Sequence, residues 1–93
     1  MATSTKVYPF YSDPGHGWLK VPRAEVKQAG LMTQISSFSY QRGQFVYLEE
    51  DCDAPKFIKA VVLNNTNIQE QPQTNGESSI RRMDRFYALN HEV

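Results

Sequence analysis

The stretch ISSFSYQRGQFVYLEE, residues 35–50, constrains the fold more than any other part of the chain. Aromatic and β-branched residues, which favour strands, flank an Arg-Gly pair at 42–43. Gly43 can adopt the positive φ that a two-residue hairpin turn requires, so we expect a β-hairpin with its turn at 42–43. Directly opposed residues share a face of a sheet. One face of this hairpin therefore carries four aromatic side chains: Phe38, Tyr40, Phe45 and Tyr47.

The register of the hairpin follows from its turn. With the turn at 42–43, Tyr40 lies opposite Phe45 and Ser39 lies opposite Val46. The second face then carries three aliphatic residues and two serines: Ile35, Val46, Leu48, Ser37 and Ser39. Helices must cover one of the two faces. If they cover the aliphatic face, the aromatic face is exposed and available for function; the sequence leaves this choice open.

Two strands and a helix precede the hairpin. KVYPFY (6–11) and WLKV (18–21) have the composition of strands, and they flank SDPGHG (12–17), which is dense in turn residues. PRAEVKQA (22–29) predicts a helix, because proline suits a first helical position and Gly30 suits the end of a helix.

A second helix is expected after the hairpin, over DAPKFIKAVVLN (53–64). Its apolar residues recur at helical spacing: Phe57, Ile58, Val61 and Val62. Asp53 is a favourable N-cap, and Asp51 lies where a carboxylate meets the positive end of the helix dipole. The simplest interpretation of these two acids is therefore structural.

The element order β-β-α-β-β-α predicts an α+β fold, with one small antiparallel sheet and helices packed on one side. A chain of 93 residues is long enough for one domain. We divide it into a flexible N-terminus (1–5), a core domain (6–63), a mobile polar connector (64–79) and a C-terminal segment that packs on the core (80–93). SSIRRMDRFYAL (78–89) predicts a short helix with a serine cap, or alternatively an extended segment anchored by Ile80 and Phe86.

The charge distribution says more than the net charge, which is zero, with ten basic and ten acidic residues. This balance argues against a protein whose main task is wrapping DNA. Four acids fall within 49–53 and three arginines fall at 81, 82 and 85, so we expect separate acidic and basic surfaces. A single cysteine, with no apolar run of membrane-spanning length and no signal peptide, predicts a soluble cytoplasmic protein that does not bind membranes.

The sequence offers little support for metal binding or catalysis. His16 and His91 are far apart, and alternation along a strand points Glu49 and Glu50 to opposite faces, so we expect no metal site and no cofactor. Cys52 lies near a predicted helix N-terminus, which lowers a thiol pKa, but its acidic neighbours act in the opposite direction. We expect Cys52 to be an inert, buried or half-buried thiol, and the protein not to be an enzyme.

Three segments resemble a family of small proteins encoded by phages, prophages and plasmids: DPGHGWLKVPRAEV, ISSFSYQRGQFVYLEEDCDAPKFIKA and SSIRRMDRF. The resemblance covers most of the chain between Tyr8 and Ala60 and reappears at Ile80-Arg81. No established activity comes with this family. The resemblance implies an accessory protein of a mobile element, and such proteins commonly bind and redirect a macromolecule of the bacterial host.

The sequence therefore predicts a non-enzymatic protein that binds a host protein or nucleoprotein complex, most plausibly to inhibit a defence system such as a CRISPR–Cas complex or another nuclease. The expected contact residues lie in the first turn, the acidic run and the C-terminal segment: Asp13, His16, Trp18, Glu49, Glu50, Asp51, Arg81, Arg82 and Arg85. The acidic run could imitate phosphates and occupy a basic channel. The alternative is a small nucleic-acid-binding module that uses the basic and aromatic residues.

Overall fold

The structure, a computed structural model, describes residues 6–61 and 66–87. In chain order the elements are strands β1 (Lys6–Ser12) and β2 (Gly17–Pro22), helix α1 (Arg23–Gln28), strands β3 (Tyr40–Arg42) and β4 (Phe45–Glu49), helix α2 (Ala54–Val61), strand β5 (Thr66–Glu70), the 3-10 helix η1 (Ser79–Arg82) and strand β6 (Asp84–Arg85). Over these described residues the fold is a small α+β domain with a six-stranded sheet and two α-helices. The expected flexible N-terminus, 1–5, lies outside the described residues, as do 62–65 and 88–93.

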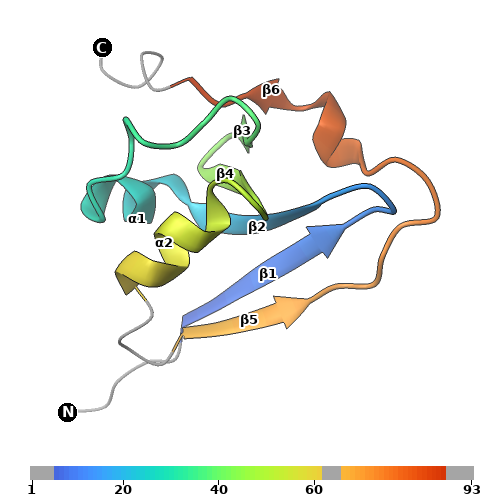
Figure 1. Ribbon diagram of the computed structural model, residues 1–93, viewed down its shortest axis with the longest axis horizontal. Coiled ribbons are helices and arrows are strands. Elements are labelled where there is room, and N and C mark those ends of the chain that lie inside the picture. Colours follow the sequence, from blue (N-terminus) through green and yellow to red (C-terminus); the bar gives the residue numbers. More distant parts are fainter. Residues whose placement is uncertain (1–5, 62–65, 88–93) are drawn as a thin grey trace.

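The sheet is mixed, which corrects the expectation of an antiparallel one. Its strand order is β5-β1-β2-β4-β3-β6, with β5 and β6 at the two edges (Figure 1). Strand β5 pairs with β1 in parallel, whereas the other pairs are antiparallel. The reason lies in the connection between β4 and β5, which contains helix α2. Such a crossover brings the next strand back in the direction of β4, and this is also the direction of β1.

Strand β5 also lies in the segment 64–79, which we expected to be a polar connector. Its main chain pairs with β1 from Lys6 to Phe10. Beyond β5, the amide of Gln71 donates to the carbonyl of Phe10 at 2.8 Å. The apolar alternation that marks a strand is weak here, because TNIQE holds one large apolar residue, Ile68. The β-β-α-β-β-α order is therefore incomplete, since β5 and β6 extend the sheet.

The hairpin of β3 and β4 has the expected faces but a different register. Arg42 pairs with Phe45 and Tyr40 with Tyr47, so the turn is at Gly43 and Gln44. Gly43 has a φ of 57°, the positive value for which glycine is suited. A shift of two residues leaves the paired side chains of β3 and β4 on their predicted faces.

Contacts from outside the hairpin stabilise this register. The amide of Arg23 donates to the carbonyl of Gln44 at 2.7 Å, and its guanidinium donates to the carbonyl of Gly43 and to Oε1 of Gln41. Residues 35–39, expected to extend β3, form turns instead.

The carboxylate of Asp53 holds those turns in place, which differs from the helix N-cap that the sequence predicted for it. Its buried carboxylate accepts hydrogen bonds from the amide and hydroxyl of Ser36, the hydroxyl of Ser39 and Nζ of Lys56. Asp53 directly precedes α2, as expected of a cap, but its side chain ties the loop before β3 to the start of α2. These hydrogen bonds hold residues 35–39 in place of pairing with a strand.

Both α-helices cover the aliphatic face of the sheet. Val26 of α1 and Phe57 of α2 are fully buried in one cluster with residues of β1, β2 and β4, and both helices lie on the same side in Figure 1. The ring of Phe57 packs edge-on against Tyr8, with centroids 5.3 Å apart. This cluster, which we call the helix-side core, consists of Tyr8, Leu19, Val21, Val26, Leu31, Ile35, Val46, Leu48, Ala54, Phe57 and Phe86.

The aromatic face is only partly exposed, although the helices cover the other face: Phe38 and Phe45 face solvent. Trp18, Tyr40 and Tyr47 are buried there beneath Ile80 of η1, and we call these four residues the aromatic cluster. The C-terminal segment therefore packs on the core as a helical turn followed by an extended strand. The hydroxyl of Ser78 caps η1 by accepting from the amide of Ile80, as predicted from the serine. Ile80 and Phe86 are its buried anchors.

Candidate binding groove

An open cavity of about 420 Å³ lies beside the aromatic cluster, and we call it the groove. It is lined by residues from four separate stretches of the chain: His16, Trp18, Phe38, Tyr40, Glu49, Asp51, Cys52, Arg81 and Arg85. Six of these are residues that the sequence predicted as contacts: His16, Trp18, Glu49, Asp51, Arg81 and Arg85. The fold thus brings together the first turn, the end of β4 and the C-terminal segment.

Asp13 joins two of these stretches. Its carboxylate accepts from Nε of Arg81 at 2.6 Å and Nη2 of Arg81 at 2.9 Å, and from the amide of Ser78 at 2.9 Å. It also accepts from the amides of Gly15 and His16, which closes the first turn. The hydrogen bond from Arg81, helped by these amides, holds the pKa of Asp13 well below its usual range, although burial acts in the opposite direction. Asp13 was predicted as a contact, but at 4% exposure it acts as an internal clamp.

Arg81 completes the clamp and covers Trp18. Its guanidinium lies 5.3 Å from the centre of the Trp18 ring, within the range of a cation–π interaction. Trp18 is almost completely buried, so it forms the floor of the groove. Arg81 is half-buried and lines the groove above it.

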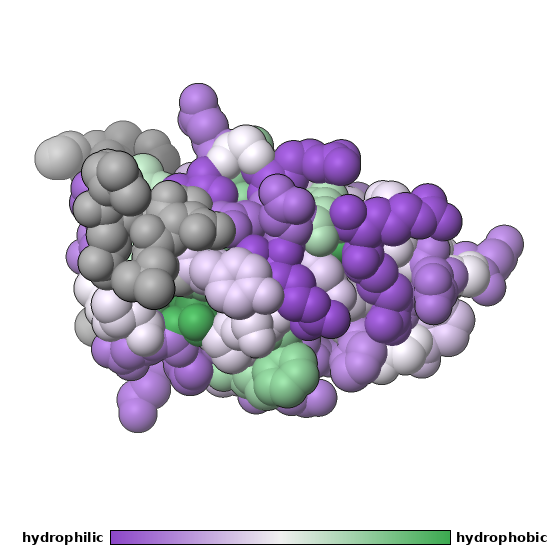
Figure 2. All heavy atoms as spheres, turned by 90° about the horizontal axis from the view of Figure 1, so that it is seen from above, coloured by the Kyte–Doolittle hydropathy of each residue, from purple (hydrophilic) through white to green (hydrophobic). Residues whose placement is uncertain are grey.

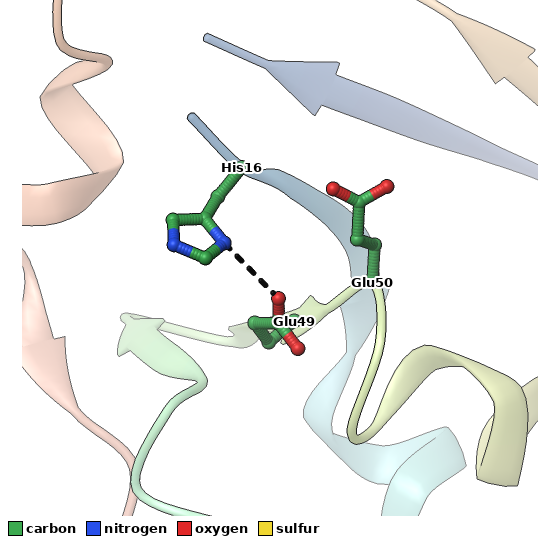
Figure 3. A group of neighbouring side chains, drawn as sticks. All are labelled: His16, Glu49 and Glu50. Carbon is green, nitrogen blue, oxygen red and sulfur yellow. Dashed lines mark ion pairs between the residues drawn. The ribbon is translucent and has the colours of Figure 1, made fainter. Parts of the chain in front are cut away.

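Glu49 is a buried carboxylate at the end of β4. Its Oε1 accepts from the amides of Asp51 and Cys52 at 2.9 and 2.8 Å, which shapes the turn that leads into α2. Its Oε2 lies 3.3 Å from Nδ1 of His16, and Figure 3 shows these two side chains pointing toward each other. Half of the His16 side chain remains exposed.

Cys52 is exposed at the groove, which corrects the expectation of a buried or half-buried thiol. Local desolvation of the sulfur, a hydrogen bond with Glu49 and the charges of Glu49, Asp53 and Asp51 raise the pKa of the Cys52 thiol. The protonated thiol is therefore favoured at neutral pH, and its nucleophilicity is low.

Phe38 and Arg85 form the exposed rim of the groove. Phe38 is 59% exposed, and Arg85 lies with its guanidinium 5.2 Å from the ring centre of Tyr40 while donating to the carbonyl of Ser37. The sequence did not single out Phe38 as a contact. Its alternation with Tyr40 placed it on the aromatic face, whose exposure the sequence left open, and the turn tethered by Asp53 moves it outward.

The other predicted contacts lie apart from the groove lining. Glu50 is exposed and lines a shallow pocket on the helix side with Phe10 and Leu19, among other residues. Arg82 is exposed on η1. The acidic run is also less exposed than expected, because Glu49 and Asp53 are buried and only Glu50 and Asp51 face solvent.

The molecule is thus a small α+β domain with a groove on the face of its sheet that the α-helices leave to the C-terminal segment. Seen from the side of η1 and β6, its surface is largely hydrophilic, with a few apolar side chains between the polar ones (Figure 2). Comparisons with protein-family models, curated proteins and solved structures found no match. Among the helices that the structure describes, none has the length and apolar character needed to cross a membrane.

Proposed function

We propose that this chain is a non-catalytic binding protein that engages a host protein or nucleoprotein complex through the groove. The observation that carries the proposal is the convergence of four distant stretches on one groove, whose rim exposes Phe38 and Arg85. Aromatic residues and arginine dominate the energetics of protein interfaces, because they bury large areas and form directional contacts.

The groove is rigidly supported. Asp13 fixes the first turn and Arg81, and Glu49 fixes the turn after β4, so both walls rest on the hydrogen bonds of two buried carboxylates. A preorganised surface loses less conformational entropy when a partner binds. These hydrogen bonds use the main titratable groups of the groove to position the main chain, which favours a binding role over a catalytic one.

The charges of the groove favour a protein partner over a nucleic-acid backbone. Asp51 and Glu49 lie in the same lining as Arg81 and Arg85. Carboxylates next to arginines repel phosphates, whereas a protein surface can present both signs. The aromatic cluster is buried under η1, so a platform of Trp18, Tyr40 and Tyr47 for stacking bases is not available in this conformation.

The biological setting of the proposal comes from the resemblance to phage, prophage and plasmid proteins. On that basis the chain acts in the host cytoplasm as an accessory protein of a mobile element, and its partner belongs to a defence system such as a CRISPR–Cas complex or another nuclease. A mixed-charge groove suits an inhibitor that attaches to the protein part of such a complex.

The test is capture from nuclease-treated bacterial lysate, followed by affinity measurement with the purified partner. Phe38→Ala should weaken binding at least about tenfold without changing the melting temperature, because Phe38 is exposed at the rim. Phe45→Ala is the matched control, since Phe45 is a partly exposed aromatic residue outside the groove, and it should leave the affinity within about twofold.

Two results would overturn the proposal. Equal losses of affinity in Phe38→Ala and Phe45→Ala would show that binding does not depend on the groove. Capture that disappears after nuclease treatment, together with direct binding of single-stranded nucleic acid by the purified protein, would favour the nucleic-acid-binding module.

A further inference from the structure

His16 and Glu49 line the groove, and Glu50, which lines the pocket on the helix side, brings a second carboxylate close to them. One ligand atom of each residue lies within 4.8 Å of the other two. From this geometry we propose that the three residues bind a divalent transition-metal ion of the zinc type. The proposal is independent of the partner-binding function, and it differs from the sequence prediction of no metal site.

The alternation of Glu49 and Glu50 expected from the sequence is retained, since Glu49 lines the groove and Glu50 lines the pocket on the helix side. Strand β4 ends at Glu49, and Glu50 begins the turn toward α2. The amide of Glu50 donates to the carbonyl of Gly17 at 3.0 Å, so its main chain lies beside the residue that follows His16. In Figure 3 both carboxylates lie on the same side of the His16 ring, with that of Glu49 facing it.

The separations are close to those of a bound metal. Three atoms within 4.8 Å of one another share a central point no more than about 2.8 Å from each of them, and zinc–nitrogen and zinc–oxygen bonds are about 2.0–2.2 Å. The 3.3 Å between Nδ1 of His16 and Oε2 of Glu49 already matches the edge of a tetrahedron with bonds of about 2 Å. Glu50 and His16 are exposed and can make the remaining movement, which is at most about 1.5 Å for a pair of ligand atoms that starts 4.8 Å apart and must close to about 3.3 Å.

The surrounding hydrogen bonds orient the ligands. The amides of Asp51 and Cys52 hold Oε1 of Glu49, which leaves Oε2 directed at His16. Asp13 accepts from the amide of His16 and is itself held by Arg81, so the histidine main chain is anchored to the C-terminal segment. Such outer contacts raise the affinity of a metal site, because the ligands need little reorganisation.

The donor set selects the kind of ion. Two carboxylates and one imidazole nitrogen suit zinc, cobalt or manganese, whereas magnesium and calcium prefer oxygen ligands alone. The two carboxylates also match the charge of a divalent cation. Three protein ligands leave at least one position of a tetrahedral ion for water or another donor.

The experiment is calorimetric titration of the chelator-treated full chain with zinc chloride, with thermal melting recorded in parallel. We expect one zinc ion per chain and a rise in melting temperature, because the ion binds the folded state. His16→Gln, Glu49→Gln and Glu50→Gln should each weaken zinc binding about tenfold or more. Gln at 49 can still accept hydrogen bonds from the two amides, so this variant retains the turn.

Three controls separate this site from others in the chain. Asp84→Asn removes an exposed carboxylate on β6, His91→Gln removes the second histidine, and Cys52→Ser removes the nearby thiol; all three should keep the wild-type affinity. Magnesium should compete weakly, because it lacks affinity for imidazole nitrogen.

Three outcomes overturn the proposal. The first is no heat and no shift in melting temperature up to millimolar zinc. The second is loss of binding in Cys52→Ser or His91→Gln with retention in Glu50→Gln, which would assign other ligands. The third is magnesium binding as tight as zinc binding and unaffected by His16→Gln, which would indicate attraction of cations to surface carboxylates only.

Discussion

The two faces of the sheet are covered in different ways. On the helix-side core, two α-helices contribute apolar residues such as Val26 and Phe57, and the contacts are almost entirely apolar. On the aromatic cluster, the cover is a single 3-10 turn that contributes one fully packed residue, Ile80, with partly buried Met83 beside it. The difference teaches that a sheet face can be closed without a full layer of helices, if polar contacts hold a short segment in place.

The polar contacts on the second face are concentrated in the clamp of Asp13 and Arg81. These residues are separated by 68 positions in the sequence, and the amide of Ser78 binds the same carboxylate. Local stability differs within a domain, and regions held by few apolar contacts open more easily than the core. The groove thus lies on the face that depends on this clamp, so its shape and the packing of the C-terminal segment are coupled.

The largest effect is expected from Phe57→Ala on the helix side. Phe57 is fully buried against Tyr8, so its truncation should cost about 3–5 kcal/mol through lost transfer energy and a new cavity. Urea denaturation measures the free energy of unfolding. Lys59→Ala on the exposed side of α2 is the control and should change it by less than about 0.5 kcal/mol. A loss below 1 kcal/mol for Phe57→Ala would show that the helix side does not dominate stability.

Ile80→Ala tests the second face. We expect a smaller cost of about 2–3 kcal/mol, because η1 can relax into the space left behind. Amide hydrogen exchange should speed up mainly at 79–85 while β4 and α2 stay protected. Equal loss of protection in α2 would mean that the two faces unfold as one unit.

Asp13→Asn tests the clamp and its pH dependence. At neutral pH it should cost about 2 kcal/mol, since an amide cannot accept from Arg81 and three main-chain amides as a carboxylate does. The pKa of Asp13 is lowered in the folded state, so its stabilising contribution is complete above the ordinary aspartate pKa of about 3.9 and is lost as the pH falls below it.

Melting temperatures between pH 3 and pH 7 check this prediction. The wild type should lose stability below about pH 4, and Asp13→Asn should flatten that slope. Asp84→Asn changes an exposed aspartate and should leave the slope as in the wild type. An unchanged slope in Asp13→Asn would assign the acid sensitivity to other carboxylates.

The smallest effect concerns a turn that lies away from both faces. Gly43→Ala should cost about 1 kcal/mol, because Gly43 has a φ of 57° and an added methyl group meets no atom within 4 Å, so strain is the only cost. Gly76→Ala also adds a methyl group into open space, without the positive φ, and thermal melting should show no loss. Equal effects at the two glycines would refute the role of Gly43 in the turn.

Local patterns predicted much of the fold. Alternation assigned Val46 to one face and Tyr47 to the other. Pro22 and Gly30 marked the first helix, and apolar spacing around Phe57 identified the second, because these signals depend on near neighbours. The pairing of β5 with β1 could not be predicted in this way. An edge strand with one large apolar residue carries little alternation, and its partner lies about 60 residues away.

For the site, the amino-acid sequence by itself determined which residue types are present and that they cluster in three stretches. Only the tertiary structure decided how each residue is used. Asp13 acts as a clamp because Arg81 donates hydrogen bonds to its carboxylate. Phe38 lies exposed on the rim because Asp53 binds Ser36 and Ser39, so the strand does not continue through this segment. The physical reason is that burial and hydrogen-bond partners arise from contacts between distant segments. A charged or aromatic residue carries no local mark of whether such a contact will bury it or leave it free to bind.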